Sequence, residues 1–299
     1  MPMRVLSGAV LIGLLVLSLL AAQAEEKGKD KDKDKDKEVD TEFIFGFTEG
    51  ADVGELREKE LEHETIARLG KRDGSYGALS DRLRYETVPL ANFRFEIGVP
   101  VAVHSISGVT GLDDRQQLAL DGLLMQLRYR LLDREHAPFA FTVGVEPHWS
   151  RTDETSGAPV DNYGGDIAVA LDKELIKNKV FAALNLVYDP EVTRSRRTGL
   201  WQREATLGVF GSVTTQLRPG IFVGAEARYL RKYDALDLQP FAGDALFFGP
   251  TMFVRFSKTL AISGSWGAQV AGRAAGDPGA LDLTNFTRQQ ATFRLEYNF

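Results

Sequence analysis

The chain ends in Ala291-Thr292-Phe293-Arg294-Leu295-Glu296-Tyr297-Asn298-Phe299, a stretch in which apolar and polar residues alternate strictly. A period of two places successive side chains on opposite faces of an extended strand. One face therefore carries alanine, phenylalanine, leucine and tyrosine, and the other carries threonine, arginine, glutamate and asparagine. A strand of this kind predicts a sheet whose two faces meet different surroundings.

The same alternation recurs from residue 59 to the end of the chain. Phe93-x-Phe95-x-Ile97-x-Val99 and Val180-x-Ala182-x-Leu184-x-Leu186 are clear examples. Alternating stretches of about ten residues, separated by turn residues, are typical of transmembrane β-barrels. About twelve such segments are present, an even number as in single-chain bacterial barrels. They cover approximately 59–70, 78–88, 92–104, 119–131, 138–150, 165–174, 179–189, 200–214, 221–231, 244–257, 259–272 and 286–299.

The links between these segments alternate in length. Transmembrane barrels have short periplasmic turns and longer extracellular loops, whereas a soluble β-sandwich has no reason to sort its loops in this way. The sequence therefore predicts an all-β fold, a closed antiparallel transmembrane β-barrel of about 12 strands. Short links lie near 89–91, 132–137, 175–178, 215–220 and 257–259, and longer links near 71–77, 105–118, 151–164, 190–199, 232–243 and 273–285.

Composition limits the possible classes of function. The 299 residues suffice for one large domain, and no cysteine is present. Such a chain has no disulfides, thiol catalysis or cysteine metal site, so the hydrogen-bonded sheet must stabilise the fold. The net charge of −6 opposes a nucleic-acid partner. Beyond the N-terminus, no apolar run reaches the length of a transmembrane helix.

The N-terminal region precedes the alternating pattern in three parts. Residues 1–24 have the features of a signal peptide, namely an early arginine, an apolar run and an Ala-Gln-Ala cleavage motif. Residues 25–42 are mostly charged and predict a disordered periplasmic segment. Residues 43–58 do not alternate reliably and predict a lead-in strand or a plug. The barrel is expected over 59–299, in the bacterial outer membrane.

The closing strand resembles that of bacterial outer-membrane β-barrels, which end in an aromatic residue, usually phenylalanine. The resemblance implies that Tyr297 and Phe299 form the signal read by the barrel-assembly machinery. It also implies periplasmic chaperones and outer-membrane lipid as further partners. These expectations concern assembly and location, and they identify no transported solute.

Two other stretches, Phe47–Glu55 and Gly70–Gly77, resemble uncharacterised proteobacterial outer-membrane barrels. These proteins are described as transporter-like or are grouped with phenol-degradation meta-pathway outer-membrane proteins. The resemblance implies passage of small organic or hydrophobic compounds, and it assigns no catalytic or binding residue. The many charges on the polar face of the strands oppose a purely hydrophobic cargo.

The polar face of the predicted strands carries charges of both signs, which would line the barrel interior. Two arrangements are possible: the charges line a hydrated pore and select solutes, or they pair across a narrow interior and partly fill it. A barrel of this size lies between small side-chain-filled barrels and large open porins. The expected lumen and selectivity residues are Glu60, Glu62, Glu64, Arg68, Arg82, Arg84, Arg94, Glu96, Arg128, Arg130, Glu146, Arg228, Arg294 and Glu296.

The sequence gives little support for catalysis or metal binding. His148 and Ser150 have a His-x-Ser spacing, but both should point inward, and no third polar group is identifiable. Glu60, Glu62 and Glu64 share one strand face and could hold a cation, but pairing with arginines of the next strand is favoured. We therefore predict that the protein is not an enzyme and needs no cofactor or metal.

The leading hypothesis for function is a porin-like channel that passes small solutes by passive diffusion, with selectivity set by inward arginines and glutamates. The alternative is a plugged structural or adhesive barrel that acts through its extracellular loops. An envelope lipid-modifying enzyme is the least favoured of the three.

Overall fold

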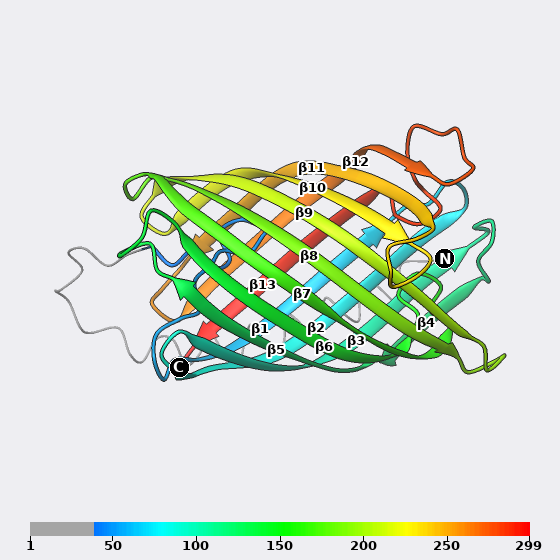
Figure 1. Cartoon of the computed structure of the whole chain (residues 1–299), viewed down its shortest axis with the longest axis horizontal. Helices are drawn as coiled ribbons and strands as arrows, with labels where there is room; N and C mark the ends of the chain where they lie inside the picture. The colour runs from blue at the N-terminus through cyan, green and yellow to red at the C-terminus, as the bar shows by residue number, and fades with distance from the viewer. Residues whose placement is uncertain (1–38) are drawn as a thin grey trace. The chain divides into compact units, whose positions relative to one another are not determined.

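One antiparallel sheet closes on itself to form a barrel in the computed structural model, which describes residues 39–299 (Figure 1). Apart from β4 and β5, strands that are consecutive in the chain are neighbours in the sheet, and the last strand pairs with the first, from Glu60 opposite Asn298 to Leu69 opposite Gln289. β4 and β5 both pair with β3 and so share one place in the ring. The 13 strand segments therefore form a 12-strand barrel, which confirms the predicted fold class.

Most strands are joined by short connections, and a longer link joins β12 to β13. Their bounds are β1 Lys59–Leu69, β2 Ser75–Leu90, β3 Phe93–Ser107, β4 Arg115–Leu120, β5 Gly122–Leu132, β6 Ala140–Thr152, β7 Pro159–Ile176, β8 Val180–Ser195, β9 Trp201–Arg218, β10 Ile221–Tyr233, β11 Phe241–Arg255, β12 Leu260–Ala274 and β13 Gln289–Asn298.

The two faces of the sheet reverse the arrangement found in a soluble protein. Large apolar side chains are exposed on the outside, such as Leu186 at 45% and Val213 at 51%. Their neighbours in sequence, Asn185 and Thr214, are polar and buried inside. An apolar exterior around a polar interior is the pattern of a barrel surrounded by lipid. The described residues include no helix that is long and apolar enough to cross a membrane.

The two ends of the barrel differ in their connections. At one end, the terminal rim, β1 begins at Lys59 and β13 ends at Asn298. At the other end, the loop rim, six links join the strands: 70–74, 108–114, 153–158, 196–200, 234–240 and 275–288. In Figure 1 the terminal rim lies at the left and the loop rim at the right.

Several strands are longer than the sequence pattern indicates. β7 begins at Pro159, so the long link expected over 151–164 shrinks to 153–158. Pairing between β6 and β7 continues as far as Thr152 opposite Pro159. This last part of the ladder consists largely of polar residues, so the apolar alternation ends before the strands do. Of the links at the loop rim, 275–288 remains long.

Substitution of an outward residue tests the lipid-facing surface. Leu186 lies near the middle of β8, so Leu186→Arg places a charge at mid-membrane depth and should cost about 2–4 kcal/mol of folding free energy. Leu200 is also exposed but lies in a link at the loop rim, so Leu200→Arg should cost at most about 1 kcal/mol. Denaturant titration in lipid vesicles measures both values. Equal costs would contradict a membrane-embedded band at Leu186.

Candidate functional site: the charged lumen and its inner segment

The structure brings the predicted lumen residues together on the inner face of the barrel. Most of them are buried, whereas Arg68, Arg82 and Arg130 are partly exposed. They come from β1, β2, β3, β5, β6, β10 and β13. Their role in selectivity stays a prediction, because their placement alone does not measure passage of any solute.

Arg84 of β2 is the centre of an ion-pair mesh that crosses the barrel. Its Nη1 lies 3.1 Å from Glu96 of β3 and 3.3 Å from Glu146 of β6, and its Nη2 lies 3.4 Å from Glu64 of β1. Arg294 of β13 lies 2.8 Å from the same Glu64. Because these side chains are withdrawn from water, removal of one charge would leave its partners uncompensated at a large cost.

The first described residues, 39–54, run inside the barrel; we call them the inner segment. Phe45 and Val53 are fully buried. The expected boundary at residue 43 placed Thr41 and Glu42 in the charged tail, whereas both are buried here. The predicted signal peptide and the tail up to residue 38 lie outside the described residues.

The base of the inner segment is held by a buried polar network at the terminal rim. Asp172 of β7 accepts hydrogen bonds from the Thr41 hydroxyl and from the Ala51 amide, each at 2.6 Å. Arg134, in the link after β5, lies 3.0 Å from Asp172 and 2.7 Å from Asp52. One carboxylate thus ties together both ends of the segment and a barrel arginine.

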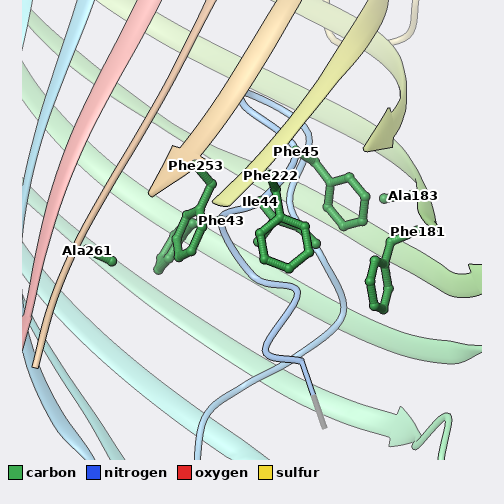
Figure 2. Close-up of a cluster of buried hydrophobic side chains, with 8 residues drawn as sticks. All are labelled: Phe43, Ile44, Phe45, Phe181, Ala183, Phe222, Phe253 and Ala261. Carbon is green, nitrogen blue, oxygen red and sulfur yellow. The ribbon is translucent and has the colours of Figure 1, made fainter. Parts of the chain in front are cut away.

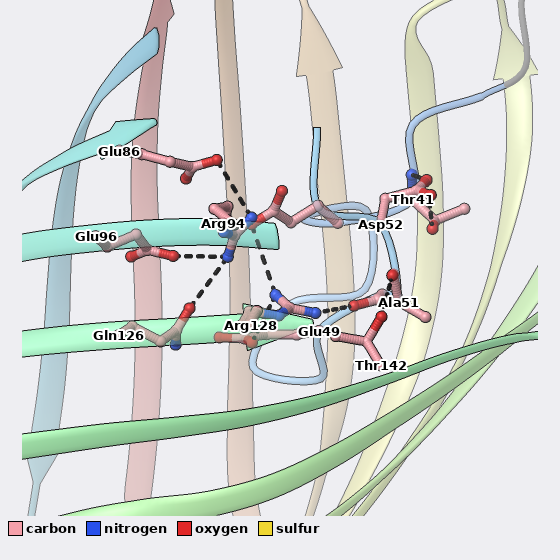
Figure 3. Close-up of polar contacts among 12 residues, drawn as sticks. Thr41, Glu49, Ala51, Asp52, Glu86, Arg94, Glu96, Gln126, Arg128 and Thr142 are labelled. Carbon is pink, nitrogen blue, oxygen red and sulfur yellow. Dashed lines mark hydrogen bonds and ion pairs between the residues drawn. The ribbon is translucent and has the colours of Figure 1, made fainter. Parts of the chain in front are cut away.

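The middle of the inner segment bonds to the wall formed by β5 and β6 (Figure 3). Arg128 donates to the Glu49 carboxylate at 3.1 Å and to the Gly50 carbonyl at 2.5 Å. The Thr142 hydroxyl donates to the Ala51 carbonyl at 2.5 Å. These bonds satisfy backbone groups that have no sheet partner, as a buried loop requires.

The turn of the inner segment reaches the opposite wall. The amide and hydroxyl of Thr48 donate to Glu226 at 2.5 and 2.8 Å, and Arg294 donates to the Gly46 carbonyl at 2.6 Å. Gly46 has a φ of 92°, and a Cβ there would lie 2.7 Å from the Ser265 Cβ. Only glycine therefore fits this approach without a shift of the wall.

Apolar contacts hold a third side of the inner segment. Phe43, Ile44 and Phe45 pack in one buried cluster with phenylalanines of the barrel wall (Figure 2). The rings of Phe181 and Phe222 pack edge to face, with their centroids 6.0 Å apart. These phenylalanines face inward, against the general pattern, because the inner segment gives them an apolar surface to cover. The barrel members of the cluster are Phe181, Ala183, Phe222, Phe253 and Ala261.

A cavity of about 480 Å³ remains in the barrel; we call it the chamber. Phe47 and Glu49 of the inner segment line it, as do Lys71 and Phe286 from the loop rim. The Arg228 guanidinium lies 3.6 Å from the centre of the Phe47 ring, a cation–π contact that fixes this part of the lining. The chamber is therefore bounded by the inner segment on one side and by loop-rim residues on the other.

Charged residues of both signs line the chamber, and those contributed by β6 to β9 are all acidic. Asp166 and Asp189 lie beside each other on β7 and β8, and neither forms an ion pair within residues 39–299. The lumen residues predicted from the sequence do not include these two aspartates. Both alternate with outward apolar residues and so point inward, but they lie near the ends of the apolar runs. The basic lining residues of β1, β2 and β13 are Arg68, Arg82, Arg84 and Arg294, and the acidic ones of β6 to β9 are Glu146, Asp166, Asp189, Glu191 and Glu204.

The link 275–288 folds into the loop-rim end of the barrel; we call it the mouth loop. Lys71 donates to the carbonyl oxygens of Thr284 at 3.0 Å and of Phe286 at 2.9 Å. Asp282 is fully buried and accepts hydrogen bonds from the backbone within the loop. The mouth loop thus narrows the chamber from the side opposite to the inner segment.

His148 has a carboxylate partner that the sequence did not identify. Its Nε2 lies 3.5 Å from Glu191 of β8, and the Asn162 side chain donates to the same carboxylate at 3.1 Å. His148 and Ser150 share the inward parity of β6, so the structure places the pair toward the lumen. An arrangement of this kind fits an ion-pair network, and it offers no lipid-facing nucleophile.

Comparisons with known proteins agree with this architecture. The sequence model of a family of unknown function, DUF6662, matches residues 37–299. A search of the curated proteins gives no match. The COG4313 outer membrane channel from Pseudomonas putida F1 is similar in structure, with a TM-score of 0.57 and 14% identity, over 88% of this chain and 100% of that chain. The likeness confirms the resemblance to outer-membrane barrels at the level of the fold.

A porin, NanC, is also similar, with a TM-score of 0.46 and 13% identity, over 80% of this chain and 98% of that chain. The KdgM porin, solved in complex with disordered oligogalacturonate, has a TM-score of 0.44 and 13% identity, over 81% and 99% of the two chains.

Neutralisation of Asp172 tests the anchor of the inner segment. Asp172→Asn leaves Arg134 without one buried partner and should weaken docking of the segment by about 3 kcal/mol. Exposed Arg57, between the segment and β1, should then be cut by trypsin at least about tenfold faster. Asp161→Asn removes a more exposed ion pair with Arg196 and should leave the rate unchanged. Equal cleavage of both variants would show that Asp172 does not hold the segment.

The titration of Lys71 tests the docking of the mouth loop. Burial lowers the pKa of Lys71 from 10.5 to about 8. When the mouth loop is undocked, Lys71 keeps its proton up to about pH 10.5, whereas in the docked state it loses the proton near pH 8; docking should therefore strengthen as pH rises through this window. Trace acetylation followed by mass spectrometry measures the pKa of Lys71 in the folded barrel. A midpoint near 10.5 would mean that Lys71 is not buried under the mouth loop.

Proposed function

The chain belongs to the DUF6662 family, whose function is unknown, and we propose that it is an outer-membrane channel for small polar solutes. Solutes would diffuse passively through the barrel by way of the chamber. The COG4313 protein, which is similar in structure, is named as an outer membrane channel, and we extend this role to the present chain.

The chamber is the observation that supports this function. Its volume of about 480 Å³ falls in the range of pockets that hold small organic molecules, roughly 300–1,000 Å³. A structural barrel of this size gains nothing from an internal cavity, since empty space forfeits packing contacts. Charged groups of both signs line the chamber, so polar or charged solutes fit it better than hydrocarbons.

The direction of passage follows from the two rims. We assign the terminal rim to the periplasm, where a chain with a cleaved signal peptide would keep both ends, and the loop rim to the exterior. A solute from outside would then pass the mouth loop, enter the chamber and leave by displacement of the inner segment. In this reading the inner segment, and not the barrel wall, sets the narrowest point.

A plugged barrel with a structural role is the second candidate. The observation in its favour is the inner segment itself, which buries Phe45, Ala51 and Val53 completely and bonds to several walls. An adhesive role receives less support, because most links at the loop rim are short. A barrel that never conducts would favour the structural role.

Ion selectivity tests the channel. Asp166 and Asp189 face the chamber without ion pairs among residues 39–299, so the wild-type protein in planar bilayers should prefer cations. Asp166→Asn/Asp189→Asn should shift the reversal potential in a KCl gradient toward the value of an unselective pore, at similar conductance. The control is Asp161→Asn, near the loop-rim end of β7, which should leave the reversal potential unchanged. Absence of conductance in the wild-type protein, together with no swelling of liposomes in small sugars or acids, would end the proposal.

A further inference from the structure

A row of three charged residues crosses the outer surface of the barrel near the loop rim. Arg231 of β10 lies directly opposite Asp244 of β11, which in turn lies directly opposite Arg273 of β12. Residues directly opposite each other in a sheet share one face. Leu230 and Lys232, the sequence neighbours of Arg231, line the chamber, so Arg231 and the rest of the row face outward.

Aromatic side chains surround this row. The Arg231 Cζ lies 4.8 Å from the centre of the Phe241 ring and 5.5 Å from that of the Tyr233 ring. The Arg273 Cζ lies 5.2 Å from the centre of the same Phe241 ring. Cation–π contacts therefore gather both guanidiniums around one phenylalanine. We call this group the arginine patch, and its members are Tyr229, Arg231, Tyr233, Phe241, Asp244 and Arg273.

The arginine patch carries more positive than negative charge. Asp244 lies 3.9 Å from Nη2 of Arg273 and accepts a hydrogen bond from the Tyr229 hydroxyl at 3.3 Å. Arg231 forms no ion pair with any carboxylate among residues 39–299, and its Nε is buried without a hydrogen-bond partner there. Two guanidiniums thus share one carboxylate, which leaves one positive charge uncompensated on a surface that faces lipid.

The arginine patch lies where the barrel leaves the membrane. Arg231 is close to the end of β10 at Tyr233, Phe241 begins β11, and Arg273 is close to the end of β12 at Ala274. Aromatic girdles of transmembrane barrels mark the level of the lipid headgroups. With the loop rim outside, as assigned above, this level is that of the headgroups of the outer leaflet.

We propose that the arginine patch binds a phosphate group of a lipid in the outer leaflet. Guanidiniums bind phosphate through paired, charge-assisted hydrogen bonds, and basic groups at a membrane surface attract anionic headgroups. A phosphate held by Arg231 and Arg273 would balance their excess charge. A lipid fits better than a soluble anion, because its chains would cover the rings of Tyr233 and Phe241. Binding requires the orientation assigned above, but not the passage of any solute.

Native mass spectrometry of the full barrel in detergent tests the arginine patch. The two probes are bisphosphorylated lipid A and the same lipid after removal of its phosphates. The phosphorylated lipid should bind, and the dephosphorylated lipid should bind at least about tenfold more weakly. Arg231→Gln/Arg273→Gln should weaken binding of the phosphorylated lipid at least about tenfold. Both side chains face outward, so this variant should keep the circular dichroism spectrum of the wild-type barrel.

Lysines at the opposite rim provide the matched control. Lys173→Gln/Lys258→Gln removes the same charge from exposed residues near the terminal rim and should leave lipid binding unchanged. The proposal is overturned if the wild-type protein binds both lipids equally, or if the arginine variant binds the phosphorylated lipid as the wild type does. Equal loss in the lysine variant would also overturn it, since attraction would then be unspecific. Displacement of the lipid by inorganic phosphate would overturn the assignment to a lipid. Conductance is measured separately, so failure here leaves the channel proposal standing.

Discussion

The alternation of apolar and charged residues imposes one constraint on the whole barrel. Because the outer face is given largely to apolar side chains such as Leu186 and Val213, most of the buried charged residues on the strands lie on the inner face. Inside, water is limited, and each charge needs a partner or an opening to solvent. The ion-pair mesh around Arg84 is the consequence, since one guanidinium contacts carboxylates from three other strands.

The inner segment belongs to the same charge balance. It contributes Glu42 and Glu49, which pair with Arg94 and Arg128 of the wall, and it covers inward phenylalanines that would otherwise face water. At the terminal rim the segment is held by hydrogen bonds from Thr41 and Ala51 to Asp172, a residue of the barrel wall. A segment held by many specific polar contacts, and not by strand pairing, can detach as a unit while the barrel ladder stays intact. Such detachment is what the proposed channel role requires.

The sequence predicted the barrel because the period of two is local and each strand repeats it. Strand ends such as Pro159 were missed where polar residues extend the ladder beyond the apolar run. The alternating pattern showed which residues of the mesh point inward, but it did not show which of them pair. Arg84 contacts Glu146, and a contact between residues so far apart in the sequence cannot be read from a local period. The inner segment was recognised as a break in alternation, and its contacts with Asp172, Glu226 and Arg294 depend on tertiary placement alone.

A reversible tether between the inner segment and the wall tests most directly whether this segment controls passage. The Thr142 hydroxyl touches the Ala51 backbone, and the chain has no cysteine, so Ala51→Cys/Thr142→Cys can form only one disulfide. Single-channel conductance is measured on the same oxidised sample before and after reduction, with Ala51→Cys alone as the control. We predict a nearly closed channel when the pair is oxidised and wild-type openings after reduction. Equal conductance in the two states would contradict a gate formed by the inner segment.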